Sequence, residues 1–189
     1  MNYQSLLKYS VNELKKNSIK NPSLDSEIIL SDILGISREN LLLNLENNIK
    51  KEKLIKFNKH LEKRKKNKPI AYIIGKKEFW KTEFVINRSV LVPRPETELI
   101  VEEALNLLKD KRNVNLLDIG TGSGCILISI LKIKKKWHGT GVDLSKNAIK
   151  VAKTNAKIQQ LENRIRFVHS DIDKFIASKY DLIISNPPY

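Results

Sequence analysis

The sequence contains a single cysteine, Cys125, among its 189 residues. One cysteine excludes an internal disulfide framework and an all-cysteine metal cluster. No apolar run reaches the roughly 18–20 residues that a membrane-spanning helix requires. The amino-terminal segment mixes apolar and polar residues, unlike the apolar core of a signal peptide. These absences predict a soluble protein of a reducing compartment, and we expect a cytoplasmic location.

Arginine is also scarce. Lysine and arginine together number 35, of which seven are arginine, and the formal net charge is +14. Lysine, isoleucine and asparagine make up 70 of the 189 residues, a bias typical of an AT-rich coding sequence. Because arginine is the better bidentate ligand for phosphate, we interpret the net charge as compositional bias rather than as a nucleic-acid footprint.

The densest positive charge lies between Lys50 and Lys68, where ten basic and two acidic residues occupy nineteen positions. Two interpretations stay open: an electrostatic footprint for RNA or an acidic partner, or the solvated face of an amphipathic helix. Leu54, Phe57 and Leu61 recur at helical spacing, which favours a docked helix over a free basic tail.

The chain divides into three predicted segments. Residues 1–68 read as a small helical bundle with no catalytic motif, and we assign them to substrate recognition. Residues 69–92 form a linker in which the pattern EFWKTEFVIN predicts a β-hairpin with its turn around Lys81 and Thr82. Residues 93–189 alternate predicted strands and helices, which indicates an α/β domain with a Rossmann-like, doubly wound parallel sheet.

A glycine-rich loop follows the first strand of this sheet and opens a helix. The sequence there is Asp118-Ile-Gly-Thr-Gly-Ser-Gly124. Glycines permit a tight turn and close approach of a ligand, and the helix start offers free N–H groups. The pattern is GxGxG rather than the dinucleotide GxGxxG, and an acid at the strand end would repel a pyrophosphate. Asp118 instead suits a cationic ligand such as the amino group of S-adenosylmethionine.

Acidic residues follow the next two strands. Asp143 lies 25 residues after Asp118, close to the spacing at which an acid binds both ribose hydroxyls. The alternative role for Asp143 is a helix N-cap, which Ser145 can supply instead. Asp171 follows the third strand, where an adenine amine would need an acceptor.

The fourth strand runs into Asn186-Pro187-Pro188-Tyr189. Two consecutive prolines remove two backbone donors and stiffen the chain, which leaves carbonyl groups free to face a ligand. An Asn side chain beside them can accept hydrogen bonds from a substrate NH₂ group, and Tyr189 supplies an aromatic wall. Asn-Pro is also a common turn dipeptide, but its place at this strand end favours a binding role.

Together these motifs resemble those of class I S-adenosylmethionine-dependent methyltransferases that act on a planar nitrogen. The segments PIAYIIGKKEFWKTEFVIN, LVPRPETELIVEEAL, LLDIGTGSGCI and SNPPY are similar to bacterial release factor glutamine methyltransferases over essentially the whole chain. This resemblance implies an enzyme that transfers a methyl group from S-adenosyl-L-methionine to the side-chain amide nitrogen (N5) of the GGQ glutamine. Its partners would be peptide chain release factors, with no membrane, no direct nucleic-acid binding and a monomeric full-length protein.

The resemblance also implies the site residues. Asn186 and Pro187 would be catalytic, by holding the amide N–H groups. The family commonly has an aromatic residue beside the adenine, but Ile172 occupies that position here, which leaves only apolar contact. No metal is expected. Substrate would contact Asn186, Pro187, Pro188 and Tyr189. Cofactor would contact Asp118, Gly120, Thr121, Gly122, Ser123, Gly124, Asp143, Asp171, Ile172 and Asn186.

Two rival functions remain open on the sequence. One is an adenine amine methyltransferase on DNA or RNA, which the NPPY motif and the basic helix would also suit. The other is an inactive or cofactor-binding-only fragment, because the resemblance implies about three further strands beyond Tyr189. We therefore expect a sheet truncated after its fourth strand, with weak cofactor binding and poor turnover by this chain alone.

Overall fold

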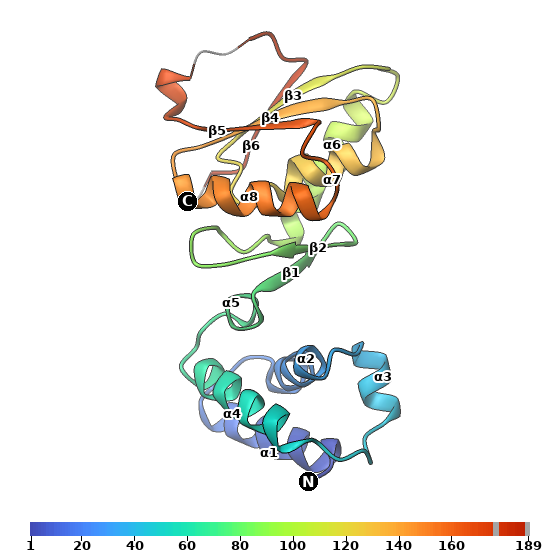
Figure 1. The fold of residues 1–189 in the computed structure, drawn as a ribbon, viewed down its shortest axis with the longest axis vertical. Helices are drawn as coiled ribbons and strands as arrows, with labels where there is room; N and C mark the ends of the chain where they lie inside the picture. Colours follow the sequence, from blue (N-terminus) through green and yellow to red (C-terminus); the bar gives the residue numbers. More distant parts are fainter. Residues whose placement is uncertain (176–177, 188–189) are drawn as a thin grey trace. The chain divides into compact units, whose positions relative to one another are not determined.

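The structure, a computed structural model, describes residues 1–175 and 178–187. The chain forms two compact units, Met1–Ile74 and Gly75–Tyr189 (Figure 1). The first unit is helical, and the second combines a hairpin with a parallel sheet and its helices. The predicted linker, residues 69–92, is divided between the two units. Residues 69–74 belong to the first unit, and the hairpin belongs to the second.

The first unit packs its helices around one apolar core. The helices are α1 (Tyr3–Lys16), α2 (Pro22–Leu34), α3 (Arg38–Leu43), α4 (Lys51–Lys65) and α5 (Ile70–Ile74). Side chains that repeat at helical spacing in α1, α2 and α4 meet there, among them the fully buried Leu6, Leu30 and Phe57. Gly35 ends α2 in the left-handed conformation with φ of 73°, where a residue with a Cβ atom would be strained.

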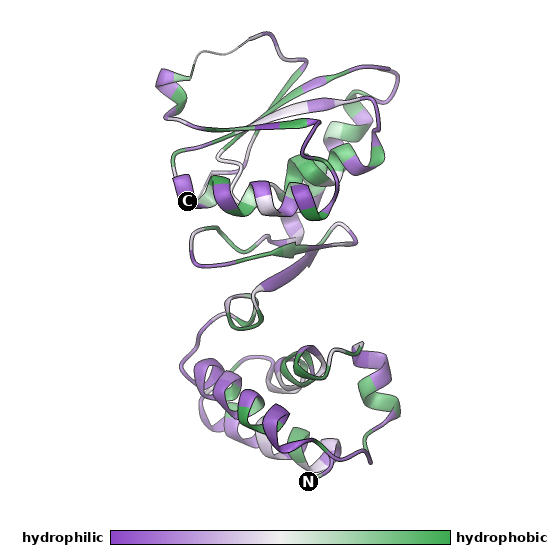
Figure 2. Ribbon diagram, in the orientation of Figure 1, coloured by the Kyte–Doolittle hydropathy of each residue, from purple (hydrophilic) through white to green (hydrophobic). Residues whose placement is uncertain are grey.

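Helix α4 carries the basic stretch and is docked by one face. Its buried residues are Phe57 and Leu61, and Figure 2 shows a largely hydrophilic ribbon interrupted by hydrophobic positions. Several of its cations are bound within the unit. Arg64 Nε donates to the buried Asp25 carboxylate at 2.6 Å, and Lys53 Nζ donates to a backbone carbonyl at 2.9 Å. These contacts support the amphipathic, docked interpretation of the basic helix.

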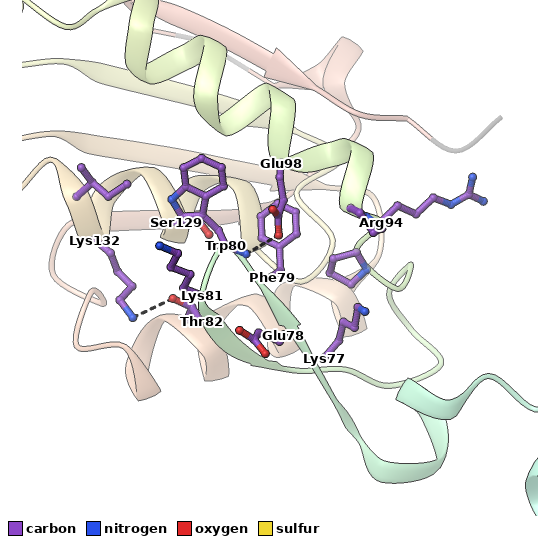
Figure 3. Close-up of a pocket in the computed structure, with 13 residues that line it drawn as sticks. Lys77, Glu78, Phe79, Trp80, Lys81, Thr82, Arg94, Glu98, Ser129 and Lys132 are labelled. Carbon is purple, nitrogen blue, oxygen red and sulfur yellow. Dashed lines mark hydrogen bonds between the residues drawn. The ribbon is translucent and has the colours of Figure 1, made fainter. Parts of the chain in front are cut away.

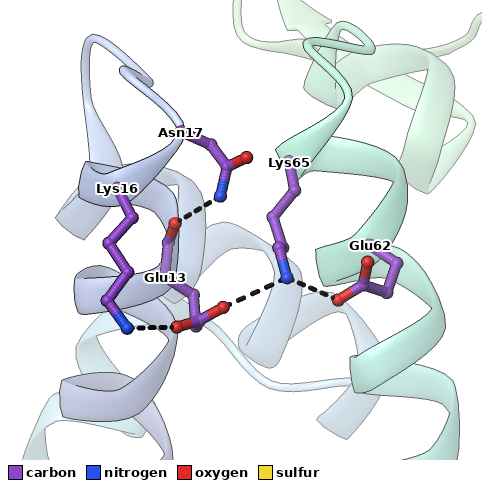
Figure 4. A network of polar contacts seen from close by, with 5 residues as sticks. All are labelled: Glu13, Lys16, Asn17, Glu62 and Lys65. Carbon is purple, nitrogen blue, oxygen red and sulfur yellow. Dashed lines mark hydrogen bonds and ion pairs between the residues drawn. The ribbon is translucent and has the colours of Figure 1, made fainter.

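A polar network ties α4 to α1 (Figure 4). Glu13 accepts from Lys16 at 2.9 Å and from Lys65 at 3.1 Å, and Lys65 also donates to Glu62 at 2.9 Å. The hydrogen bonds from the two lysines lower the pKa of Glu13. Asn17 closes the end of α1 by donating to the Glu13 carbonyl at 2.9 Å. The network lies at the surface, so its contribution to stability is small.

The second unit begins with an antiparallel hairpin. Strands β1 (Lys76–Phe79) and β2 (Thr82–Val85) pair through the turn residues Trp80 and Lys81, whose φ angles are 48° and 57°. This is the turn conformation that Asn-Gly usually adopts. The Glu98 carboxylate offsets part of the strain by accepting from the Trp80 N–H at 2.8 Å.

The parallel sheet follows. After η1 (Pro95–Thr97) and α6 (Glu98–Leu107) come β3 (Asn115–Ile119), α7 (Cys125–Ile133), β4 (His138–Asp143), α8 (Lys146–Ile158), β5 (Ile165–His169), η2 (Ile172–Lys174) and β6 (Leu182–Ser185). The strand order is β5-β4-β3-β6, with every neighbouring pair parallel. Helix α7 is buried along most of its length, since it packs against the sheet with α6 and α8 at its sides. The predicted class, a helical bundle plus a Rossmann-like parallel sheet, is confirmed.

This topology fixes the position of the candidate site. β3 lies between β4 and β6, and all three strands run the same way, so the loops after them meet at one edge of the sheet. Ser185 pairs with Ile119, which places the start of the NPPY segment beside the glycine loop. Asp143 pairs with His169 on the other side, so the loops after β4 and β5 complete the same edge.

Candidate functional site

The glycine loop adopts a conformation that only glycines take readily. Gly120, Gly122 and Gly124 have φ angles of 72°, 55° and 77°. Nothing lies within 4 Å of a Cβ atom built at Gly120, so the space beside this backbone is open to a ligand. Two hydrogen bonds anchor the loop to β4. The Gly120 and Thr121 N–H groups both donate to the Val142 carbonyl, at 2.8 and 3.0 Å.

Asp118 is buried beneath this loop. Its side chain is 1% exposed, and one carboxylate oxygen accepts from the Thr121 hydroxyl at 2.7 Å. Burial raises the pKa of Asp118 from 3.8 to about 7, although the Thr121 hydrogen bond lowers it and the nearby charge of Asp143 raises it further. A carboxyl group with this pKa at a strand end is suited to a cationic ligand, which would restore its ionised form.

Asp143 connects the glycine loop after β3 to the loop after β4. Its carboxylate accepts from the Gly122 N–H at 2.9 Å and from the Ser145 N–H at 2.8 Å. The N-cap of α8 is Ser145, whose hydroxyl accepts from the Ala148 N–H at 3.2 Å, so the helix does not need Asp143 for this purpose. Each Asp143 oxygen makes one backbone hydrogen bond and keeps a further acceptor position for a ligand hydroxyl.

The hydroxyls of Thr121 and Ser123 point into the protein rather than toward a ligand. Thr121 is 5% exposed and its hydroxyl is committed to Asp118, while Ser123 is 3% exposed. Their backbone groups are therefore what a ligand at this loop would contact. Asp171 caps η2 by accepting from the Asp173 N–H at 3.2 Å, and Ile172 beside it is 40% exposed.

Asn155 also supports the loop, a role that was not predicted from the sequence. Its amide nitrogen donates to the Ser123 carbonyl at 2.9 Å and to the Val85 carbonyl at 3.1 Å. Its amide oxygen accepts from the Val85 N–H at 2.8 Å. The available signal was a polar residue on the apolar face of α8, beside the buried Ala152 and Ala156.

The NPPY segment meets the Pro93–Glu98 stretch in a pocket of about 530 Å³. Asn186 Nδ2 donates to Thr97 Oγ1 at 3.0 Å, across 89 residues of sequence. With the nitrogen held in this way, Asn186 Oδ1 remains as an acceptor. Arg94, Glu96 and Pro187 also line this pocket. The other two residues predicted to bind substrate, Pro188 and Tyr189, lie outside the described residues.

Other chemistries have little support within the described residues. Among residues 1–175 and 178–187, no group of three His, Cys, Asp or Glu side chains is placed to bind a metal ion. Burial raises the pKa of Cys125 to about 12, so its thiol stays protonated and unreactive at neutral pH. No described helix has the length and apolarity needed to cross a membrane.

We expect the Gly141→Ala substitution to disturb the loop through its support. A Cβ atom at Gly141 would lie 2.8 Å from the Phe167 ring and 2.9 Å from the Thr121 hydroxyl. The overpacked strand should lose about 1–3 kcal/mol of unfolding free energy, and Thr121 should lose its hold on Asp118. Tryptophan fluorescence during urea unfolding measures this, because both tryptophans, Trp80 and Trp137, lie in the second unit. An unchanged midpoint would contradict the prediction.

Comparisons with known proteins agree with this architecture. The family described as PrmC N-terminal domain matches residues 5–75, and the methyltransferase small domain matches residues 97–189. The release factor glutamine methyltransferase of Fusobacterium nucleatum is 41% identical over 185 residues, which cover 95% of this chain and 51% of that protein. The enzyme of the same name from Leptospira interrogans is 42% identical and covers 98% of this chain and 66% of that protein.

A third relative, the release factor glutamine methyltransferase of Buchnera aphidicola, is 39% identical over the whole of this chain and 68% of its own length. The chain thus spans about half to two thirds of the length of these three relatives. The helical first unit, the glycine loop and the Asn-Pro segment all lie within the matched residues. The chain belongs to the release factor glutamine methyltransferase family.

Proposed function

We propose that this chain carries the cofactor site and the amide-binding motif of an S-adenosyl-L-methionine-dependent methyltransferase. Its target is the side-chain amide nitrogen (N5) of the glutamine in the GGQ motif of peptide chain release factors. The observation that carries this proposal is the placement of Asn186, held by Thr97, directly beside the open glycine loop after β3. The names of the relatives support the choice of release factors as partners.

The residues at this edge fit the cofactor. The open backbone at Gly120 would take its chain, the buried Asp118 would pair with its amino group, and Asp143 would accept from the ribose hydroxyls. Asp171 and Ile172 would contact the adenine, the latter through apolar contact only. When bound, S-adenosylmethionine supplies an activated methyl group on a positively charged sulfur.

The contribution of the protein is positioning. An amide nitrogen is a poor nucleophile because its lone pair is delocalised into the carbonyl. Asn186 Oδ1 and the Pro187 carbonyl can each accept one N–H of the glutamine amide, which would hold the nitrogen at the strand end next to the one that carries the glycine loop. The same two acceptors stabilise the positive charge that develops on the nitrogen. The proton can leave to water afterwards, so no strong general base is needed.

The experiment is transfer of a labelled methyl group from S-adenosylmethionine to an unmethylated release factor. The matched control is the same release factor with the GGQ glutamine replaced by alanine. Label on the first substrate and not on the second supports the proposal. Label on double-stranded DNA or RNA instead would overturn it in favour of an adenine amine target. Calorimetric binding of cofactor with no transfer to either substrate would assign the chain to the cofactor-binding-only alternative.

A further inference from the structure

A second pocket in the second unit, of about 920 Å³, is larger than the one at Asn186 (Figure 3). It is bounded by the β1–β2 hairpin, the segment Pro93–Pro95, the first turn of α6 and the second half of α7. The glycine loop opens α7 at Cys125, whereas this pocket uses Ser129, Lys132 and Ile133 farther along the helix. It is therefore distinct from the cofactor edge, although Arg94 lines both pockets.

The lining carries an excess of positive charge. Its cations are Lys77, Lys81, Arg94 and Lys132, and its acids are Glu78 and Glu98. Glu98 is already engaged by the Trp80 N–H at 2.8 Å. Lys132 donates to two uncharged oxygens, Thr82 Oγ1 at 3.0 Å and Gln159 Oε1 at 2.9 Å, and pairs with no carboxylate among residues 1–175 and 178–187. A carboxylate ligand would complement this lining.

The hairpin presents an aromatic residue to the same pocket at an energetic cost. Trp80 and Lys81 both adopt positive φ angles, a conformation that costs non-glycine residues of order 1–3 kcal/mol each. The strained turn places the Trp80 side chain along the pocket, where it is half-buried rather than packed in the core. Trp80, Phe79 and Pro93 give one side of the pocket an apolar character. Tryptophan at such a position is typical of binding surfaces.

A buried hydroxyl in the pocket wall lacks a hydrogen-bond partner in the part of the chain that the structure describes. Ser129 lines the pocket from α7, is 1% exposed, and its Oγ atom makes no hydrogen bond with any described residue. An unsatisfied buried hydroxyl lowers the stability of the folded protein unless a ligand completes its hydrogen bonds. Figure 3 shows Ser129 next to Trp80 and Lys81, where its hydroxyl would donate to an oxygen of a ligand bound by Lys81.

We propose that this pocket binds an acidic segment of a protein partner, with an apolar side chain against Trp80 and carboxylates on Lys77, Lys81 and Lys132. A polypeptide is favoured over nucleic acid because Glu78 and Glu98 lie among the cations, where a continuous phosphate backbone would be repelled. The carboxylates of a peptide are separate from one another, so each can pair with one lysine without lying against Glu78 or Glu98. The proposal concerns a surface separate from the methyl-transfer site and does not rest on the proposed function.

The test titrates the full chain with the peptide acetyl-Glu-Glu-Leu-Glu-Glu-amide and follows the indole N–H signals by NMR. The chain has two tryptophans. The Trp80 signal should move saturably, whereas Trp137 should not, because it is 1% exposed with its Nε1 bound to the Lys111 carbonyl. A control peptide in which glutamine replaces each glutamate should bind at least about tenfold more weakly. Added salt should weaken the binding of the glutamate peptide.

Two double variants distinguish binding in the pocket from general electrostatic attraction of the peptide to a basic protein. Lys77→Ala/Lys81→Ala should weaken binding about tenfold, while Lys135→Ala/Lys136→Ala removes the same charge outside the pocket and should leave it unchanged. Equal weakening by both pairs would overturn the proposal. Tighter binding of a ten-nucleotide oligothymidylate at Trp80 would also overturn it, in favour of nucleic acid.

Ser129→Ala tests the buried hydroxyl. If the hydroxyl serves a ligand, its removal should raise the melting temperature by about 2–4 °C and weaken peptide binding about three- to tenfold. The opposite pattern, a lower melting temperature with unchanged binding, would assign Ser129 to packing alone and remove it from the site.

Discussion

Replacing Asp118 by asparagine is expected to stabilise the folded chain at neutral pH and to weaken its binding of S-adenosylmethionine about a hundredfold at pH 8. In the folded protein the pKa of Asp118 is raised from 3.8 to about 7, chiefly by burial. Such a difference corresponds to about 4 kcal/mol of unfolding free energy. Asparagine retains an oxygen that can accept from the Thr121 hydroxyl but carries no charge.

The pH dependence of this effect has a definite sign. Below pH 3.8 Asp118 is protonated in both the folded and unfolded chain, so it contributes no difference. Between pH 4 and 7 the folded chain holds a proton that the unfolded chain has lost, so the free energy of unfolding falls as pH rises. Above pH 7 the loss is complete and constant. The asparagine variant should lack this decline, so its advantage should grow from pH 4 to pH 7.

Cofactor binding should show the reverse trend. A cationic group on the ligand requires Asp118 in its ionised form, so affinity should fall about tenfold for each pH unit below 7. Asp118→Asn should weaken binding about a hundredfold at pH 8. Urea unfolding followed by tryptophan fluorescence and calorimetric titration measure the two effects. Asp110→Asn, an exposed acid, is the matched control and should change neither. Loss of stability without loss of affinity would contradict the assignment of Asp118.

Asn186→Ala is expected to reduce the single-turnover rate of methyl transfer by about 10²–10³-fold, a prediction that rests on the proposed function. The side chain supplies one of the two acceptors for the glutamine amide, and alanine leaves that N–H without a partner in the transition state. Binding of S-adenosylmethionine should change much less, because the glycine loop and Asp143 do not depend on Asn186.

Thr97 should act on the same step through Asn186. Thr97→Val keeps the shape of the buried side chain but removes the acceptor for Asn186 Nδ2, so the amide is free to rotate. We expect about a tenfold lower rate with little change in KM for the cofactor, and recovery in Thr97→Ser, which restores the hydroxyl. Equal losses in Thr97→Val and Thr97→Ser would point to packing rather than to orientation of Asn186.

Much of the fold and part of the candidate site could be predicted from local sequence patterns. The strand at 115–119, the glycine loop and the helix after it were predictable because apolar runs, glycines and helix starts are local signals. The roles assigned to Asp143 and Asp171 stay predictions. The hairpin was also predicted, but its turn, expected around Lys81 and Thr82, lies one residue earlier at Trp80 and Lys81, neither of which is favoured at positive φ.

Contacts between distant residues were not predictable. Glu98, which holds the Trp80 turn, lies 18 residues away, and Asn186 lies 89 residues from Thr97. The motifs that contain Thr97 and Asn186 were both recognised, but nothing in their spacing indicates that they meet. The pairing of β6 with β3 brings Asn186 to this edge of the sheet, and Thr97 reaches it at the start of α6, which packs against α7.

The hydrogen bonds of Asn155 have a consequence for solubility. Strand β2 pairs with β1 on one side, and its other side would present unpaired backbone groups to any passing strand. At Val85 the Asn155 amide donates to the backbone carbonyl at 3.1 Å and accepts from the backbone N–H at 2.8 Å. A residue of a neighbouring strand would make the same pair of hydrogen bonds. This amide occupies the position where a second polypeptide would begin to add, so the hairpin is closed to edge-to-edge aggregation at that residue.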